Sequence, residues 1–496
     1  MHFGKKLVLF SLVAVCVLTG LLYYASVEEE RSASGTELMF YCAAGIKPPV
    51  EAVVWEYEQA YGVRIQLQYG GSGTLLSNLR VAGSGDLYLA GDDSYIALGR
   101  THGLVAESVP LATLRPVIAV QKGNPRGIVS LSDLMREDVA VAVGNPDAAA
   151  VGKVTRRVLT GMGMWESFEK HVKVFKPTVM DVANDIRLGA VDAGIIWDAT
   201  ANQHPEVDMV VVPELARAAK TIAIGVLTTS QQPTAALRFI RYLGARDRGL
   251  RAFARFGYQP VDGDVWAEAP ELVFYSGGVN RLAVEKTVAA FEAREGVRVT
   301  SVYNGCGILV SQMKAGASPD AYFACDRSFM VQVNDLFVDP MDVSETDMVF
   351  LVPKGNPRGI HALADLGRAG LKVGLANAEQ SALGALTKRL LERTDVYAAV
   401  MGNVKTQSPT ADLLVNQMRT GSLDAVIVYE ANTAYVREHL DILPIPHPDA
   451  KAVQPIAVNK GSKHTYLGRR LVEAILSSRS RETFESLGFR WKAEGE

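Results

Sequence analysis

Three loops of small residues could together bind an oxyanion, and each of them occurs twice in this 496-residue chain. Each loop is rich in glycine, alanine or serine and precedes a segment that we predict to be helical. Small residues let the backbone approach a ligand closely, and the first N–H groups of a helix have no partner within the helix, so they can donate to an anion. The loops and their copies are Cys42–Gly45 with Ser276–Val279, Gly70–Thr74 with Asn304–Ile308, and Asn145–Gly152 with Asn377–Gly384.

Hydroxyl groups in the second loop would add to these backbone donors. Ser72 and Thr74 both lie there, and Cys306 replaces the serine in the copy. A helix N-terminus stabilises a nearby negative charge by roughly 0.3–1 kcal/mol, rising to about 2 kcal/mol when partly buried. Two or three termini and a hydroxyl could therefore hold a divalent oxyanion without an arginine. A single Gly-Ser-Gly is usually an ordinary turn, so the prediction depends on the recurrence of three loops in the same order.

The loops belong to a duplication that covers most of the chain. Lys122–Ile128 returns letter for letter as Lys354–Ile360, 232 residues later, and Asp86 returns as Asp320 at a spacing of 234. Such a long period indicates two copies of one globular domain rather than a solenoid of short repeats. We expect a membrane anchor and stalk in residues 1–36, a first domain in residues 37–262, a linker in residues 263–271 and a second domain in residues 272–496.

Within each copy, β-like segments alternate with amphipathic helical segments. Leu38–Cys42 and Arg64–Gln68 are typical of strands, whereas Val50–Tyr61 and Thr74–Val81 have the apolar spacing of helices. This alternation predicts an α/β fold with a parallel, helix-covered sheet. In such a sheet, ligands bind where the carboxyl ends of strands meet helix N-termini, and the three loops follow strands.

The composition excludes several other classes of protein. The net charge of −3 gives no basic surface for nucleic acid. The eight histidines have neither metal-finger nor HExxH spacing. No set of acids, histidines or nucleophiles recurs in both copies. We therefore expect neither an enzyme nor a bound cofactor or metal.

The N-terminus carries a membrane signal. Lys5 and Lys6 precede an apolar run, residues 7–24, and Glu28–Glu30 follow it. A helix of about eighteen residues spans about 27 Å, close to the hydrocarbon thickness of a bilayer, and the order of charges directs the rest of the chain out of the cytoplasm. We expect an uncleaved transmembrane helix there, with a cleaved signal peptide as the alternative.

Two further pairs of side chains could modify an oxyanion site. Lys47 and Arg281 occupy matched positions after the first loop, where a cation could face the cleft or form a surface pair with a nearby glutamate. Cys306 and Cys325 share the second copy and could be a disulfide, a soft-metal pair or two inert thiols. Cys42 has no partner cysteine in its own copy and is expected to be a small buried residue.

Six short motifs of the first copy follow one another in a characteristic order, namely Ala43–Gly45, Gly71–Leu75, Gly83–Asp86, Val120–Pro125, Gly144–Asp147 with Gly152, and Ile195–Trp197. In this order the chain resembles the molybdate- and tungstate-binding family, extracytoplasmic binding proteins of ABC importers. The resemblance covers almost all of residues 38–260 and 272–490. It implies two tandem periplasmic-binding-protein-like domains of type 2, each with two α/β lobes around a cleft, after the transmembrane helix.

The resemblance also places the binding residues of that family on this sequence. The family's first-loop serine falls on Gly45 and Val279, and its second-loop serine falls on Ser72 and Cys306. Its third-loop backbone donor falls on Val151 and Leu383, and its contact at a helix start falls near Val182 and Leu414. Its tyrosine falls on Trp197 and Tyr429. The first-loop hydroxyl is therefore absent from both copies. Thr74, Lys47 and Arg281 complete the candidate residues.

The resemblance implies a receptor that captures a small oxyanion, molybdate or tungstate above all, by closing its two lobes. Its partner would be the permease of an ABC importer, and both domains would lie on the extracytoplasmic side of the cell membrane. Two alternatives stay open. One is a membrane-tethered sensor or scaffold with degenerate pockets; the other is a receptor for ferric or soft-metal ions, suggested by Tyr41, Tyr275, Tyr429 and the two cysteines.

Overall fold

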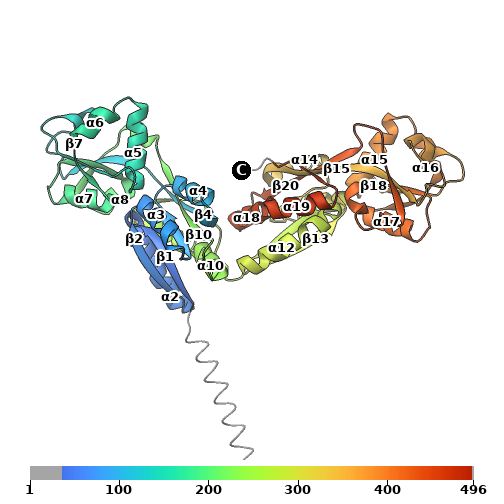
Figure 1. Ribbon diagram of the computed structural model, residues 1–496, viewed down its shortest axis with the longest axis horizontal. Coiled ribbons are helices and arrows are strands. Elements are labelled where there is room, and N and C mark those ends of the chain that lie inside the picture. The colour runs from blue at the N-terminus through green and yellow to red at the C-terminus, as the bar shows by residue number, and fades with distance from the viewer. Residues whose placement is uncertain (1–35, 494–496) are drawn as a thin grey trace, which may run out of the picture. The chain divides into compact units, whose positions relative to one another are not determined.

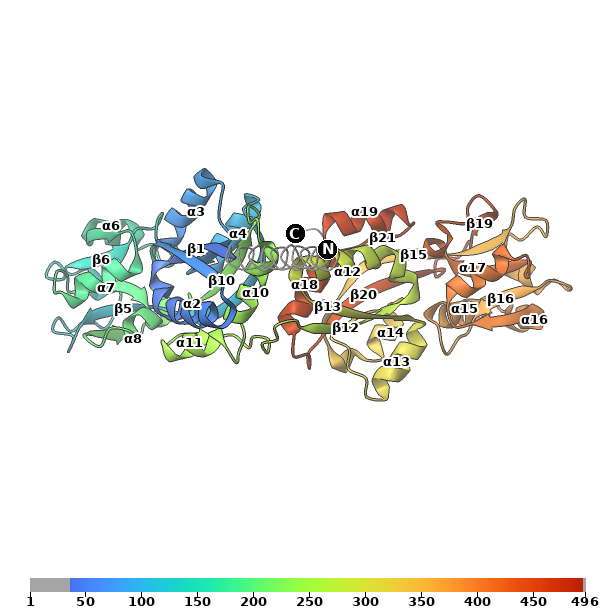
Figure 2. The ribbon, with the colours of Figure 1, turned by 90° about the horizontal axis from the view of Figure 1, so that it is seen from below.

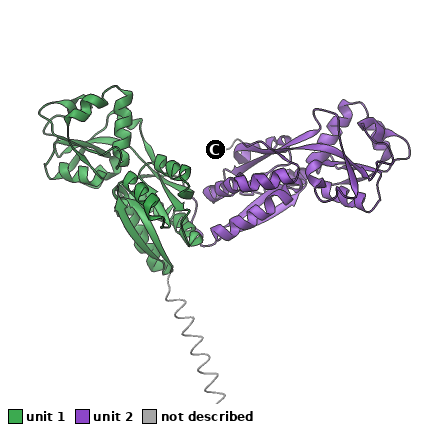
Figure 3. Cartoon of the chain, in the orientation of Figure 1, with its two compact units in different colours: residues 1–262 green, residues 263–496 purple. Residues whose placement is uncertain are grey.

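The computed structural model describes residues 36–493, and the chain divides into two compact units (Figure 3). The first unit ends at Asp262 and the second begins at Gly263. In both units strands alternate with helices, as Figure 1 shows, which confirms the predicted α/β architecture. The predicted transmembrane helix at residues 7–24 lies outside the described residues. Within residues 36–493, no helix combines the length and the hydropathy that a membrane crossing requires.

The first unit contains two sheets, and each sheet is the centre of one lobe. Its strands are β1 (Glu37–Ala43), β2 (Arg64–Gly70), β3 (Leu87–Ala90), β4 (Val105–Leu114), β5 (Pro116–Gln121), β6 (Val141–Gly144), β7 (Val172–Lys176), β8 (Ala193–Trp197), β9 (Val207–Val210), β10 (Lys220–Leu227) and β11 (Gln259–Pro260). The six-stranded sheet has the order β11-β4-β10-β3-β1-β2, and the five-stranded sheet has the order β7-β6-β8-β5-β9.

Helices cover both sheets of the first unit. They are α2 (Lys47–Tyr61), α3 (Ser72–Ala82), α4 (Asp93–Thr101), α5 (Ala150–Gly161), α6 (Trp165–His171), α7 (Val179–Arg187), α8 (Asp198–Asn202), α9 (Pro213–Ala216), α10 (Pro233–Leu243) and α11 (Gly249–Arg255). Figure 2 shows α6, α7 and α8 beside β5 and β6, and α2, α3 and α10 beside β1 and β10. The two groups are the two lobes.

The second unit has the same order of elements, except that one strand matches both β4 and β5 and that α8 and α9 have no α-helical counterpart among the described residues. Its strands are β12 (Glu271–Gly277), β13 (Arg298–Asn304), β14 (Ala321–Phe323), β15 (Phe337–Pro353), β16 (Val373–Ala376), β17 (Val404–Ser408), β18 (Ala425–Tyr429), β19 (Leu440–Pro444), β20 (Lys451–Asn459) and β21 (Arg490–Trp491). Its helices are α12 (Arg281–Glu295), α13 (Cys306–Lys314), α14 (Arg327–Val331), α15 (Ala382–Arg393), α16 (Tyr397–Asn403), α17 (Ala411–Arg419), α18 (Thr465–Ile475) and α19 (Ser478–Ser486).

The strand that connects the two lobes is continuous in the second unit and interrupted in the first. β15 runs through both lobes, so the second unit has one ten-stranded sheet. In the first unit the matching stretch breaks between β4 and β5, where Pro116 lacks the N–H that a continuous ladder needs. The backbone N–H of Arg115 at this break donates to Asp198 at 3.1 Å, and its guanidinium pairs with the same carboxylate. Met348 replaces the proline in the second unit, and β15 passes through it.

Ion pairs stabilise β15, the strand that runs through both lobes of the second unit. Arg490 pairs with Glu345 at 2.8 Å and with Asp347 at 2.6 Å. Burial raises the pKa of Glu345, but hydrogen bonding from Arg490 and the charges of Lys492 and Lys451 outweigh that effect, so the pKa lies below its ordinary value. The ionised form of Glu345 is therefore favoured in the fold.

Residues 263–271, which we expected to be a linker, are joined to the second unit by hydrogen bonds. The Asp264 carboxylate accepts from the backbone N–H groups of Tyr466 and Leu467, at 2.9 and 3.0 Å, at the start of α18. Val265 donates to the carbonyl of Lys463 at 3.0 Å. An acidic group at a helix N-terminus satisfies backbone donors that the helix leaves open.

The strand order places the three loops of each unit together. β1, β2 and β3 are parallel to one another, as are β6, β7 and β8. Their carboxyl ends therefore lie at one edge of each sheet, and the loops leave from those edges. Residues from both sets of loops line one pocket, so the two edges face each other across the space between the lobes.

Candidate ligand-binding pockets

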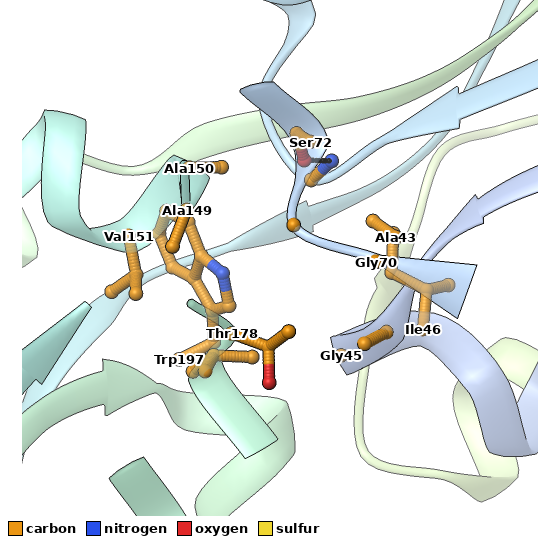
Figure 4. Close-up of a pocket in the computed structure, with 14 residues that line it drawn as sticks. Ala43, Gly45, Ile46, Gly70, Ser72, Ala149, Ala150, Val151, Thr178 and Trp197 are labelled. Atoms are coloured by element: carbon orange, nitrogen blue, oxygen red, sulfur yellow. Dashed lines mark hydrogen bonds between the residues drawn. The ribbon is translucent and has the colours of Figure 1, made fainter. Parts of the chain in front are cut away.

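The first pocket lies between the two lobes of the first unit and has a volume of about 310 Å³. Figure 4 shows its labelled side chains around a central space, with Ala43, Gly45 and Ile46 opposite Val151 and Trp197. The lining residues are Ala43, Ala44, Gly45, Ile46, Gly70, Gly71, Ser72, Gly91, Ala149, Ala150, Val151, Thr178, Val179 and Trp197. None of them carries a charge.

Three helices of the first unit begin at this pocket. α3 begins at Ser72, α5 at Ala150 and α7 at Val179, and all three residues line the space. Neither α3 nor α5 has a side chain that caps its N-terminus. α7 is capped by Thr178, whose hydroxyl donates to Asp181 at 2.6 Å and accepts from the Asp181 N–H at 3.2 Å. The starts of α3 and α5 therefore leave backbone donors open to a ligand.

Ser72 is the buried hydroxyl of the first pocket. Its side chain accepts a hydrogen bond from the N–H of Gly91 at 3.1 Å, which leaves its proton free to be donated to a ligand. Its carbonyl accepts from the hydroxyl of Tyr88 at 2.7 Å, and burial raises the pKa of Tyr88 well above its ordinary value. Tyr88 is thus a permanent donor that orients the backbone of Ser72.

The neighbour of Gly45 in the opposite lobe explains why the first-loop hydroxyl is absent. A Cβ on Gly45 would lie 2.6 Å from Cγ1 of Val179 in the opposite lobe, which is shorter than real Cβ contacts. The second unit has the reverse arrangement, because Val279 faces Ala411 in place of Gly45 and Val179. The two units therefore fill the same space with one large and one small residue, and neither has a hydroxyl there.

Glycines allow the two lobes to touch beside the pocket. The N–H of Gly73 donates to the carbonyl of Ala148 at 2.9 Å, and a Cβ on Gly73 would lie 2.3 Å from the carbonyl oxygen of Asp147. The second unit repeats the contact, with Gly307 donating to the carbonyl of Gln380 at 3.0 Å. Only a residue without a side chain permits this approach of two backbones.

The structure places some of the sequence candidates in the first pocket and others outside it. Gly45, Ser72, Val151 and Trp197 line the pocket. Thr74 is exposed on α3. Lys47 pairs with Glu51 at 3.5 Å and lies over the ring of Tyr69, so it forms the surface pair that was one of its two expected roles.

At these two helix starts, the residues that line the pockets lie about one turn before Val182 and Leu414. Val182 is fully buried in α7 and Leu414 is fully buried in α17, and neither lines a pocket. Thr178 and Thr410, the residues before the two helices, line the pockets instead. The threonine followed three residues later by Asp181 is a capping-box signature, which marks Thr178 as the residue before the helix.

The second pocket occupies the matching place in the second unit, with a volume of about 270 Å³. Val279, Leu383 and Tyr429 line it, whereas Arg281 pairs with Glu285 on the surface at 3.4 Å. The lining residues are Gly278, Val279, Asn304, Gly305, Cys325, Ser381, Leu383, Pro409, Thr410, Ala411, Asp412 and Tyr429. Unlike the first pocket, it includes a carboxylate, that of the exposed Asp412.

The polar groups at the base of the second pocket differ from those of the first. Cys306 is fully buried next to the pocket, and its sulfur accepts from the N–H of Cys325 at 3.0 Å, as Ser72 accepts from Gly91. Burial raises the pKa of Tyr429, and its hydroxyl has no hydrogen-bond partner among the described residues. Residues 36–493 contain no group of three or more His, Cys, Asp or Glu that could hold a metal ion.

The sequence model of a family described as bacterial extracellular solute-binding protein matches residues 38–259 and, again, residues 272–490. A protein of Haemophilus influenzae, whose name states only that it is a binding protein, is 27% identical over 231 residues, which are 46% of this chain and 94% of that protein. The molybdate-binding protein ModA of Mycobacterium tuberculosis is 26% identical over 257 residues, which are 50% of this chain and 95% of that protein. These relatives are binding proteins, in agreement with the prediction that the chain is not an enzyme.

A solved structure is similar to part of the chain. The periplasmic molybdate-binding protein of Azotobacter vinelandii superposes with a TM-score of 0.39 at 14% identity, covering 45% of this chain and 98% of that one.

Proposed function

Because this chain belongs to the family of bacterial extracellular solute-binding proteins, we propose that its first unit captures a small oxyanion and presents it to the permease of an ABC importer. Molybdate and tungstate are the first ligands to test, because a relative that matches half of the chain is named a molybdate-binding protein. Both units would lie outside the cytoplasm, tethered by the helix predicted at residues 7–24.

The observation that carries this proposal is the set of donors around the first pocket. The starts of α3 and α5 have no side-chain cap, Ser72 has a proton to donate, and no acidic side chain is among the lining residues. Neutral donors at helix N-termini stabilise an anion that is already fully ionised, without a counter-charge. The lining consists mainly of glycine, alanine and other short side chains from both lobes, which lets the backbones approach closely and favours a small ligand.

Closure of the lobes would couple binding to delivery. An anion in the first pocket contacts donors of both lobes at once, and so favours the arrangement in which Gly73 donates to Ala148. A ligand that binds only this arrangement shifts the population toward it, and the permease can then recognise the closed form.

Thermal unfolding of the full chain with molybdate, tungstate, sulfate or phosphate tests the proposal. A ligand at 100 times its dissociation constant stabilises the folded form by about 2.7 kcal/mol, which gives a clear shift of Tm. We expect the shift with molybdate and tungstate. Absence of a shift with all four anions would contradict the proposal.

A pair of serine variants locates the site. A hydrogen bond to a charged group is worth roughly 1.5–3 kcal/mol, so Ser72→Ala should weaken binding by roughly 10- to 150-fold. Ser77→Ala is the matched control, because Ser77 is exposed on the same helix. Equal affinities of the two variants would place the anion somewhere else.

A further inference from the structure

Three of the substitutions that distinguish the second pocket from the first depend on one another. Cys306 replaces Ser72, Cys325 replaces Gly91, and Gly277 replaces Ala43 at matched positions. A Cβ on Gly277 would lie 2.2 Å from the sulfur of Cys325, so an alanine there could not coexist with the thiol in this position. The glycine thus makes the room that the sulfur of Cys325 occupies.

The two sulfurs are close neighbours. The same point, a Cβ on Gly277, lies 2.9 Å from the sulfur of Cys306, and the N–H of Cys325 contacts that sulfur at 3.0 Å. The matched positions of the first unit give the corresponding distance, because a Cβ on Gly91 would lie 3.8 Å from Oγ of Ser72. Because a Cβ on Gly277 would lie 2.2 Å from one sulfur and 2.9 Å from the other, the two sulfurs are at most about 5 Å apart, and side-chain rotation would have to bring them to the S–S bond length of about 2.05 Å.

A location outside the cytoplasm favours oxidation of these two thiols. Disulfides persist in proteins outside the cytoplasm, and the family of this chain is extracellular. Cys42, Cys306 and Cys325 are all unlinked in this structure, and only Cys306 and Cys325 share a unit. Of these two, Cys325 lines the pocket, so a reagent that enters the pocket meets Cys325 first.

We propose that the second pocket is an oxidation site, in which Cys306 and Cys325 become a disulfide outside the cytoplasm, and that it does not bind the oxyanion taken by the first pocket. The oxyanion part rests on the proposed function, whereas the disulfide part depends only on the extracytoplasmic location.

Thiol–disulfide exchange with a small disulfide supplies the chemistry. Cys325 loses its proton and attacks the reagent, forming a mixed disulfide and releasing one thiol. Cys306 then loses its proton and attacks the sulfur of Cys325, which forms the internal S–S bond and releases the second thiol; the reagent takes up two electrons. Hydrogen bonding with Cys306, and then burial, raises the pKa of Cys325 well above its ordinary value, so the reaction should accelerate as the pH rises.

The side chain of Cys325 also accounts for the loss of anion binding. A Cβ on Gly91 would point among Ser72, Ala150 and Trp197, at 3.6–3.8 Å from their atoms. The space that the first pocket keeps open at Gly91 is therefore filled by the thiol in the second. The carboxylate of Asp412 on the lining further opposes an anion.

The full chain, treated with oxidised glutathione at pH 8.5, quenched in acid and alkylated after denaturation, gives the test by peptide mass mapping. We expect Cys306 and Cys325 to be recovered as one cross-linked species, and Cys42 as an alkylated free thiol. Cys306→Ser and Cys325→Gly should abolish the cross-link; both install the residue that the first unit carries. Cys42→Ser, the matched control, should keep it. Free, alkylated Cys306 and Cys325 in the treated native chain would overturn the disulfide, and this measurement needs no variant to fold.

Equilibrium dialysis with molybdate separates the two claims. We expect one anion per chain, with or without reductant. Two anions per chain would overturn the second half of the proposal. No bound molybdate would refute molybdate as the ligand in the proposed function and leave the mass measurement to decide the disulfide.

Discussion

Replacing Gly73 with alanine tests whether the two lobes of the first unit must touch for the ligand to bind. The new Cβ would lie 2.3 Å from the carbonyl oxygen of Asp147, and contacts below 3.0 Å essentially do not occur, so the lobes must separate by about 0.7 Å at this point. Forced overpacking costs about 1–3 kcal/mol, and here it falls only on the closed form. The apparent affinity should therefore drop roughly five- to 150-fold.

The same substitution should not reduce the stability of the ligand-free protein. Gly73 lies in the first turn of α3, and alanine is favoured over glycine in helices by roughly 0.5–1 kcal/mol. Weaker binding with an unchanged or higher Tm is the expected signature, measured by titration calorimetry with molybdate and by thermal unfolding without it. Gly161→Ala is the matched control, because a Cβ on Gly161 meets nothing within 4 Å at the end of α5. Wild-type affinity of the Gly73 variant would refute the role of lobe contact.

Three further changes have defined outcomes. Gly45→Ser together with Val179→Ala should restore the first-loop hydroxyl and tighten anion binding roughly tenfold or more, whereas Gly45→Ser alone should not, since its Cβ meets Val179 at 2.6 Å; calorimetry compares them. Lys47→Ala should leave the dissociation constant unchanged, because Lys47 pairs with a surface glutamate; a tenfold loss would show that the cation faces the anion. The pKa of Glu345 is lowered in the fold. Its contribution to stability is therefore complete above its unfolded pKa of about 4.3 and disappears as the pH falls through the folded value. Glu345→Gln should flatten the fall of Tm between about pH 5 and pH 3, and a pH profile identical to that of the unchanged protein would contradict this assignment.

The order of strands and loops could be predicted because it depends on neighbours in the chain. The recurrence of Lys122–Ile128 revealed the duplication, and small residues after each strand marked the loops. Ser72 was predicted as a ligand contact from its own loop, and Val151 was implied by the family resemblance. Both line the first pocket, where their role stays a prediction.

Contacts between distant segments could not be predicted in the same way. Thr178, not Val182, lines the pocket, because the residue before α7 rather than one a turn into it reaches the space between the lobes. Gly91 was missed, although it also follows a strand, because nothing in its own sequence shows that Ser72 accepts its N–H. Pro116 interrupts the connecting strand in the first unit only, so one substituted residue separates an interrupted strand from a continuous one.

The sequence by itself determined that two α/β units occur and which loops end their strands, since hydrophobic periodicity and turn residues act over a few positions. Only the tertiary structure decided what meets across each pocket: Val179 excludes a side chain at Gly45, and Gly277 admits the sulfur of Cys325. These pairs are separated by scores of residues in the chain, and their fit depends on distances of a few ångströms between packed backbones, which no local pattern records.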